Sequence, residues 1–372
     1  MTKNSSVLVV TFFLFLISFR ITYDFLNGIE YHYEEAQYWV WSQNPSLSYL
    51  TKGPFVASII SLSNSIFGQS YLGLKFFSLL AYIGTIIFMS YSSIALNKDK
   101  NIGVTALLIT GLSPAVFFLG GVASTDVYLF FFWSLALFGY IKFYVNKDER
   151  WFYLISLATG LGLLTKLSMA LLPTSILIYF LVTENRKYFY SIHLYFSALL
   201  AILIASPIII WNIDNDWLTL SHEMGHLVSG TPSNNPEILL MTMIVTIPSA
   251  LLLFIKDIRA KIFSKESSFL LIPFLIMFSF FVLKSFSGKI QLNWTIPLFL
   301  TLVPLLSYAV NNKTKSVIAL SFFILSPIFL ISNKQISSLL SDNDPLHPMR
   351  GWNQTYEYLF KDETYNLLSS SD

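Results

Sequence analysis

The feature that most constrains this chain is a series of long apolar segments recurring along its 372 residues. Of its residues 54% are hydrophobic and only 12% are charged, about half the charge of an average soluble protein. Mean hydropathy is +0.62. Charge this sparse does not cover the surface of a water-soluble fold of this length, so a soluble enzyme is excluded. The sequence predicts an all-α, polytopic integral membrane protein.

A helix needs roughly 20 apolar residues to cross the hydrocarbon core of a bilayer. On that rule we expect about eleven spans, at 6–26, 72–96, 102–122, 127–145, 151–165, 167–183, 190–211, 237–255, 268–285, 294–310 and 316–332. The first apolar run is followed by no small-residue cleavage site, which favours a retained helix over a signal peptide. Spans 151–165 and 167–183 are short and are separated only around Lys166, so we expect a hairpin there.

Basic residues set the expected orientation, because Lys and Arg are enriched in cytoplasmic loops. Most of the 23 Lys and Arg lie at the N-terminus or in loops near 98–100, 142–150, 186–187, 256–265 and 313–315. This places the N-terminus in the cytoplasm and three longer polar segments on the outer face: 27–71, 212–236 and 333–372. Segment 27–71 is rich in Tyr and Trp, which predicts interfacial helices in the first outer loop.

We therefore expect one transmembrane domain over 1–332, with the chemistry in its first outer loop 27–71, and a short outer tail at 333–372. A net charge of +2 gives no reason to expect a nucleic-acid partner. The chain has no cysteine, which excludes disulfides, thiolate metal sites and cysteine nucleophiles.

Two adjacent acids, Glu34 and Glu35, follow the first span. Like charges and partial dehydration both favour a neutral carboxyl group, so a raised pKa is expected, which suits a general base at neutral pH. The alternative is that both are solvated residues at the start of an interfacial helix.

Lys52 and Asp126 also fall at the expected outer interface. Lys52, in the segment Tyr49–Pro54, is placed to hold a phosphate as a point charge, or else it extends to bulk lipid headgroups. Asp126 ends the segment that starts at Gly120, and either it or Ser124 could cap the helix that follows. The shared face would let Glu34, Lys52 and Asp126 surround one site.

The segment His222–His226 matches H-E-x-x-H, which on a helix brings two zinc-binding histidines to one face. It makes a membrane zinc protease a further alternative. Against it, Gly225 weakens a helix, the segment lies in an expected polar loop, and the nearest following acid that could be a third ligand is Glu237.

Several motifs, in order along the chain, resemble the bacterial lipid-linked sugar transferases of the GT-C fold, the large family of protein mannosyltransferases and lipid A aminoarabinose transferases. The segments that carry the resemblance are Tyr33–Ser42, Tyr49–Phe55, Phe67–Gly73, Ala123–Trp133, Gly160–Lys166, Pro207–Trp217, Gly225–His226, Lys289–Trp294 and Asp344–Trp352. They cover essentially the whole chain. Gly225–His226 falls where the family commonly has Gly-His, which makes the H-E-x-x-H match a coincidence.

The resemblance implies an inverting glycosyltransferase that moves a sugar from a polyprenyl-phosphate donor to lipid A, another glycolipid or a protein, on the outer face of a bacterial inner membrane. It implies that Glu34 is the base, that Lys52 holds the leaving phosphate and that Asp126 orients a substrate. Glu35 positions the loop. The remaining substrate-binding candidates it implies are Tyr38, His226, Lys289 and Arg350.

Two positions depart from the family pattern. Glu34 stands where the family has Asp, so the base reaches about one methylene further, and Gly53-Pro54 replaces Pro-Pro, which we expect to loosen the backbone beside Lys52. The residues imply no certain cofactor and no clear ligand set, and they leave a divalent metal open. A transporter or lipid flippase is the competing class. It would more often show internal repeats and interrupted helices near the midplane, whereas this sequence shows no repeat and its notable charges gather on one face.

Overall fold

The computed structural model describes residues 14, 17–23, 29–111, 113–228, 259–260, 262–287 and 292–310, and this part of the chain is helical throughout apart from turns and loops. The elements are α2 (Tyr33–Gln43), α3 (Phe55–Phe67), α4 (Tyr71–Asn97), α5 (Lys100–Gly111), α6 (Pro114–Leu119), α7 (Thr125–Asn146), α8 (Trp151–Leu163), η1 (Leu167–Ala170), α9 (Leu171–Val182), η2 (Glu184–Tyr190), α10 (Ile192–Asp214), α11 (Leu218–Val228), η4 (Lys265–Ser267), α14 (Ser268–Ser287), η5 (Leu292–Thr295) and α15 (Ile296–Val310). The predicted all-α class is confirmed.

Four described helices are long and apolar enough to cross a membrane: α4, α7, α10 and Lys265–Phe286. A fifth is added if α9 and η2, bent by 116° at their junction, form one span. The single span predicted at 102–122 is instead two helices, α5 and α6, because proline occupies position 114, where its ring starts a new helix more readily than it continues one. Predicted spans 237–255 and 316–332 lie outside the described residues, so about eleven spans stays a prediction.

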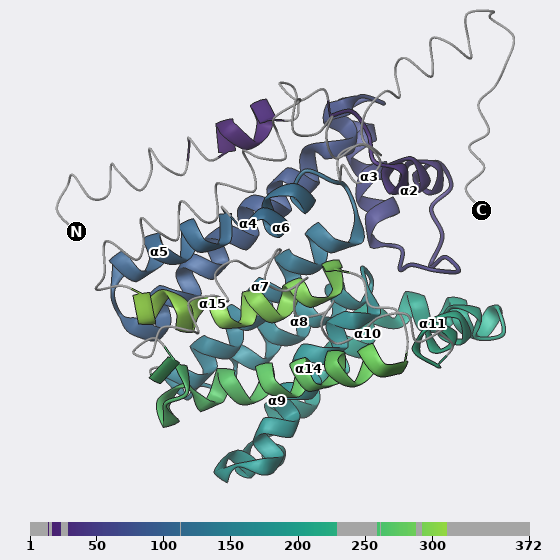
Figure 1. Cartoon of the computed structure of the whole chain (residues 1–372). Coiled ribbons are helices and arrows are strands. Elements are labelled where there is room, and N and C mark those ends of the chain that lie inside the picture. The colour runs from purple at the N-terminus through teal and green to yellow at the C-terminus, as the bar shows by residue number, and fades with distance from the viewer. Residues whose placement is uncertain are drawn as a thin grey trace, which may run out of the picture.

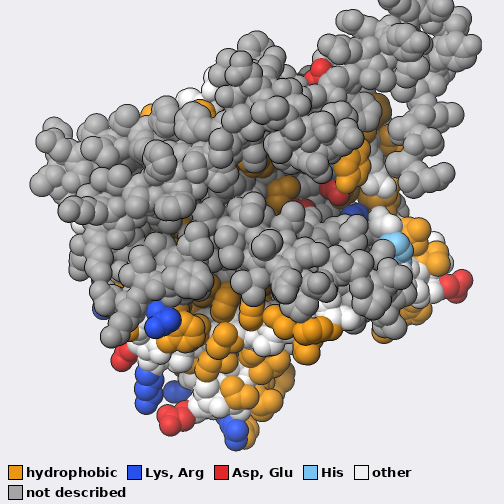
Figure 2. Space-filling view, in the orientation of Figure 1, with side chains coloured by type: hydrophobic (Ala, Val, Ile, Leu, Met, Phe, Trp, Pro, Cys, Tyr) orange, Lys and Arg blue, Asp and Glu red, His pale blue; other side chains and the backbone are white. Residues whose placement is uncertain are grey.

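Helix α7 is the centre of the bundle, and most of its side chains are buried. It packs against α4, α8 and α15, while α8 packs in turn against α10 (Figure 1). By contrast, α10 exposes Leu199, Ile202 and Leu203. In the space-filling view hydrophobic side chains cover much of the described surface, and charged ones gather at its lower end (Figure 2). Apolar surface of this kind belongs in lipid, so the chain is an integral membrane protein.

Two hydrogen bonds join α7 to later helices. The indole N–H of Trp133 donates to Thr301 Oγ1 on α15 at 3.0 Å, and the hydroxyl of Tyr140 donates to the carbonyl of Phe269 on α14 at 2.9 Å. All four groups are buried in an apolar interior, where an unpaired donor is costly. These bonds therefore help to fix how α14 and α15 lie against α7.

The chain crosses the bundle back and forth, with α5 and α6 together making one crossing, and this brings distant turns to one end, where α2, α3 and α11 also lie (Figure 1). Hydrogen bonds tie these turns together: Lys75 Nζ donates to Gly121 O at 2.8 Å, Phe55 N to Leu164 O at 3.1 Å, and Thr219 Oγ1 to Tyr49 O at 3.1 Å. The polar segments predicted to share one face are therefore close together wherever the structure describes them.

The main attachment of α2 to this bundle is a buried ion pair. The Glu35 carboxylate is fully buried and lies 2.9 Å from Lys75 Nζ on α4. It also accepts hydrogen bonds from the backbone N–H groups of Ala123, at 2.6 Å, and His32, at 2.8 Å. Lys75 in turn donates to the Gly121 carbonyl. Helices α2 and α4 and the turn before α7 are thus joined through two charged side chains.

We expect Lys75→Met to lower the free energy of unfolding by about 3–5 kcal/mol, because it leaves the Glu35 carboxylate buried without its cation. The double variant Glu35→Gln/Lys75→Met removes both charges and should lose much less than the sum of the two single changes. The measurement is the denaturation midpoint of the four proteins in lipid nanodiscs.

Lys142→Met is the matched control. Lys142 lies near the C-terminal end of α7, away from the Glu35–Lys75 pair, and it contacts the Trp151 ring rather than a carboxylate. Additive effects of the two single changes would contradict the proposed anchoring.

Candidate active site

Helix α2 begins immediately before the acid pair. His32 is its N-cap: the His32 side chain accepts a hydrogen bond from the Glu34 backbone N–H, while the Glu35 side chain accepts one from the His32 N–H. This reciprocal capping fixes the start of the helix. Since successive residues on a helix point about 100° apart, Glu34 and Glu35 face different surroundings.

Glu34 faces a cluster of charges at the end of the bundle. It is partly buried, and its pKa is raised, first by burial and then by the negative charge of Asp126. Lys52 and Lys166 act in the opposite direction. Asp126, from a different helix, therefore affects the pKa of Glu34 more than the adjacent Glu35 does. The cluster combines two acids and two lysines from four separate segments of the chain.

Asp126 lies in the first turn of α7 and is almost fully buried, with 3% of its surface exposed. Ser124 is the N-cap of this helix, which leaves the Asp126 carboxylate for other partners. Lys166 Nζ donates to Asp126 Oδ1 at 2.8 Å, and the Asn293 side-chain amide donates to Oδ2 at 2.6 Å. Both oxygens are thus held by groups from the far side of the site.

The sequence alone did not identify Lys166 and Asn293 as site residues. Lys166 marked only a break between two short apolar spans, and it follows α8 at the start of η1. Asn293 lies in η5, inside the motif segment Lys289–Trp294. A lysine between apolar helices is a strong signal for a buried partner, because an unpaired charge there is expensive. Asn293 carries no comparable signal.

Lys52 is held close to this cluster by the residue that follows it. Gly53 is buried, and a Cβ at this position would collide with the Leu164 carbonyl at the end of α8. Phe55 N also donates to that carbonyl at 3.1 Å. The expectation that glycine loosens the backbone here is therefore wrong: glycine lets two segments touch, and the backbone beside Lys52 packs against the end of α8.

Tyr38, one turn after Glu34 on α2, is completely buried. Burial raises its pKa well above the ordinary value, with the charge of Glu34 as the next cause. The phenol therefore stays neutral and forms part of the wall of the site. Of the other candidates, His226 lies in α11, and Lys289 and Arg350 lie outside the described residues.

Residues 218–228, which include the H-E-x-x-H match, form helix α11. The expectation that this segment lies in a polar loop is therefore wrong. Within the part of the chain that the structure describes, no group of three or more His, Cys, Asp and Glu residues is placed to hold a metal ion.

Comparison with known sequences agrees with this geometry. The family model for dolichyl-phosphate-mannose-protein mannosyltransferases matches residues 51–211, a region that contains Lys52, Asp126 and Lys166. The lipid A galacturonosyltransferase RgtD of Rhizobium johnstonii (strain DSM 114642 / LMG 32736 / 3841) is 25% identical over 233 residues, which are 60% of this chain and 46% of RgtD. An uncharacterised protein of Aquifex aeolicus (strain VF5) is 29% identical over 157 residues, 42% of this chain and 32% of that protein. The chain thus matches less than half the length of either relative.

The fold is similar to that of ArnT from Cupriavidus metallidurans. The apo structure superposes with a TM-score of 0.69 and 17% identity, over 91% of this chain and 65% of ArnT. The structure with undecaprenyl phosphate gives 0.68 and 17%, over 92% and 66%. The family model, the similarity to RgtD and the ArnT-like fold agree with the resemblance to GT-C lipid-linked sugar transferases that the motifs carry.

Proposed function

We propose that the protein is an inverting glycosyltransferase that moves a sugar from a polyprenyl-phosphate donor to lipid A, another glycolipid or a protein. The observation that carries the proposal is the convergence of Glu34, Lys52, Asp126 and Lys166 at one end of an apolar helix bundle. A lipid-linked donor explains why an enzyme of this class would consist almost wholly of membrane helices. In a bacterium the lipid would be undecaprenyl phosphate, the ligand named for one ArnT structure.

In this proposal Glu34 is the general base. Its carboxylate takes the proton from an acceptor hydroxyl, whose oxygen attacks the anomeric carbon of the donor sugar. The bond between that carbon and the phosphate oxygen breaks on the opposite side, which inverts the configuration. A raised pKa suits this role, because a base is most effective when its pKa lies near the working pH.

Lys52 would bind the phosphate of the donor and stabilise the negative charge that develops as the polyprenyl phosphate leaves. Its fixed position against the end of α8 supports this role, because preorganised charges need no rearrangement during the reaction. A lysine ammonium is a compact point charge that suits a phosphate group.

Asp126 is less suited to removing a proton, because Lys166 and Asn293 already donate to its two oxygens. We assign it to orientation of the substrate and to holding Lys166 beside the reacting centre. Tyr38, as a neutral phenol, would border the sugar. Glu35 would contribute by anchoring α2, and Lys289, Arg350 and His226 remain proposed contacts to phosphate or acceptor.

We further propose the predicted arrangement in the inner membrane: a cytoplasmic N-terminus, a single transmembrane domain over 1–332, and the site and the tail 333–372 on the outer face. Among the described residues, the basic loops near 98–100, 142–150 and 186–187 lie at the end of the bundle away from the acid–lysine cluster, which supports this orientation.

Glu34→Gln should lower the rate of sugar transfer by about 10²–10⁴-fold, because the amide keeps the shape of the side chain but does not accept a proton. Glu34→Asp should retain part of the activity, since a carboxylate remains one methylene shorter. The measurement is release of free polyprenyl phosphate from a panel of polyprenyl-phosphate sugars by the protein in nanodiscs.

Glu184→Gln, an acid-to-amide change in η2 at the opposite end of the bundle, is the control and should leave release unchanged. Full activity of Glu34→Gln would rule out the proposed role of Glu34.

The pH dependence of transfer tests the electrostatics of the site. The base must be ionised, so activity falls as the pH falls through the pKa of Glu34, which lies above its ordinary value. The positive charge of Lys52 lowers that pKa, so Lys52→Gln should move the acid limb of kcat/KM to higher pH. Asp126 raises the pKa of Glu34, so Asp126→Asn should move the acid limb to lower pH. Both shifts are measured in the residual activity of each variant.

Lys52→Arg retains the charge and is the control that should leave the acid limb in place. Shifts of both charge-removing variants in the same direction would show that the limb reports a group other than Glu34.

A further inference from the structure

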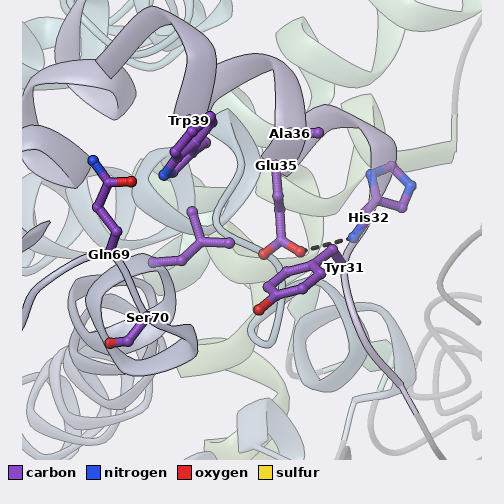
Figure 3. Close-up of a pocket in the computed structure, with 8 residues that line it drawn as sticks. Tyr31, His32, Glu35, Ala36, Trp39, Gln69 and Ser70 are labelled. Carbon is purple, nitrogen blue, oxygen red and sulfur yellow. Dashed lines mark hydrogen bonds between the residues drawn. The ribbon is translucent and has the colours of Figure 1, made fainter. Parts of the chain in front are cut away.

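A cavity of about 310 Å³ opens on another side of α2 from the acid–lysine cluster. It lies between the start of α2 and the start of α4, and its walls include Tyr31, Trp39, Gln69 and Ser70, with Glu35 between the two aromatic side chains (Figure 3). Its volume is at the lower end of the range typical of small-ligand sites.

This cavity is separate from the acid–lysine cluster. Trp39 follows Glu34 by five residues, which turns it about 140° away around the helix. Glu34, Lys52, Asp126 and Lys166 are not among the described residues that line the cavity. Glu35 and His32 connect the two regions, because both line the cavity, Glu35 is the neighbour of Glu34 in sequence, and His32 accepts a hydrogen bond from the Glu34 backbone N–H.

The cavity offers no free charge among the described residues that line it. The Glu35 carboxylate is engaged by Lys75 and by two backbone N–H groups. The His32 pKa is lowered, chiefly by burial, so the imidazole is neutral at pH 7. A phosphate or carboxylate would find no free cation here, and an ammonium group would find no free anion. These surroundings favour an uncharged ligand.

The cavity nevertheless offers hydrogen-bond donors beside aromatic surface. Within the described part of the chain, neither the Trp39 indole N–H nor the Tyr31 hydroxyl has a hydrogen-bond partner. Burial raises the Tyr31 pKa, with Glu35 as the next cause, so its hydroxyl keeps its proton. The Gln69 amide, which gives one hydrogen bond to Gln43, adds further polar groups. Flat apolar faces with a few oriented polar groups match a sugar ring, which carries C–H groups on its faces and hydroxyls around its edge.

We propose that this cavity is a binding site for an uncharged pyranose ring. The ring could belong to a soluble saccharide or to the headgroup of a membrane glycolipid, and both present the same chemistry. The cavity's surroundings accommodate a lipid tail, because Tyr71 and Leu72 at the start of α4 expose 42% and 52% of their surfaces beside it. The Glu34 carboxylate does not line the cavity, so binding there can be measured separately from sugar transfer.

The test is saturation-transfer NMR of the whole protein in nanodiscs, with methyl β-D-glucopyranoside and methyl β-D-galactopyranoside as probes. We expect transfer to the ring protons of at least one probe. Trp39→Ala, which removes one wall, and Ala36→Leu, which fills the cavity, should each weaken binding by about tenfold. Thermal unfolding midpoints establish that each variant is folded.

Trp151→Ala is the matched control, because Trp151 is a partly buried tryptophan at the start of α8, at the other end of the bundle. Glu34→Gln should also bind the probe normally, which separates this proposal from the proposed transfer activity. No binding of either probe, or equal binding by wild type and both cavity variants, would overturn the proposal.

A second arm identifies the source of the ring. A diacylglycerol carrying the same sugar is incorporated in the nanodisc and competes with the methyl glycoside. Displacement at much lower amounts of the glycolipid, lost in Trp39→Ala, assigns the site to a glycolipid headgroup. Displacement only at amounts matching the free glycoside assigns it to a soluble saccharide.

Discussion

The buried ion pair between Glu35 and Lys75 is the interaction on which the geometry of the site depends. Removing two charges from water is costly, and the cost is offset only where every remaining donor and acceptor is paired. Here the carboxylate receives the ammonium group and two backbone N–H groups, and the ammonium also meets the Gly121 carbonyl. Because Glu35 adjoins Glu34 and Ala123 lies three residues before Asp126, the pair holds both candidate catalytic acids in position.

The acids beyond this anchor have contrasting surroundings. Asp126 is held by Lys166 and Asn293, whereas Glu34 has no ion pair among the described residues and its pKa is raised. Two carboxylates placed so differently divide the work in a way familiar from acid–base catalysis, where environment sets the role of each group. The geometry thus favours Glu34 for proton transfer and Asp126 for orientation.

The helical class and the positions of α4, α7, α8, α10 and α14 were predictable, because long apolar blocks signal membrane helices directly. Which charged residues pair with one another could not be predicted from the sequence. Glu35 and Lys75, and likewise Asp126 and Lys166, are separated by 40 residues, and Asn293 lies 167 residues from Asp126. Such contacts depend on how helices rotate and pack, which hydrophobicity alone leaves open.

Expectations based on the local sequence were also wrong where tertiary packing determined the structure. Gly53 suggested a loose backbone but allows close contact with Leu164, and the expected polar loop around Gly225 is part of helix α11. The most direct test of the account compares Glu34→Gln with Glu35→Gln in the same nanodisc preparation, recording the unfolding midpoint and the release of polyprenyl phosphate. We predict that Glu34→Gln loses release of polyprenyl phosphate with an unchanged midpoint, while Glu35→Gln unfolds at a lower temperature. Equal effects of the two changes on both measurements would contradict the division between a reacting acid and an anchoring acid.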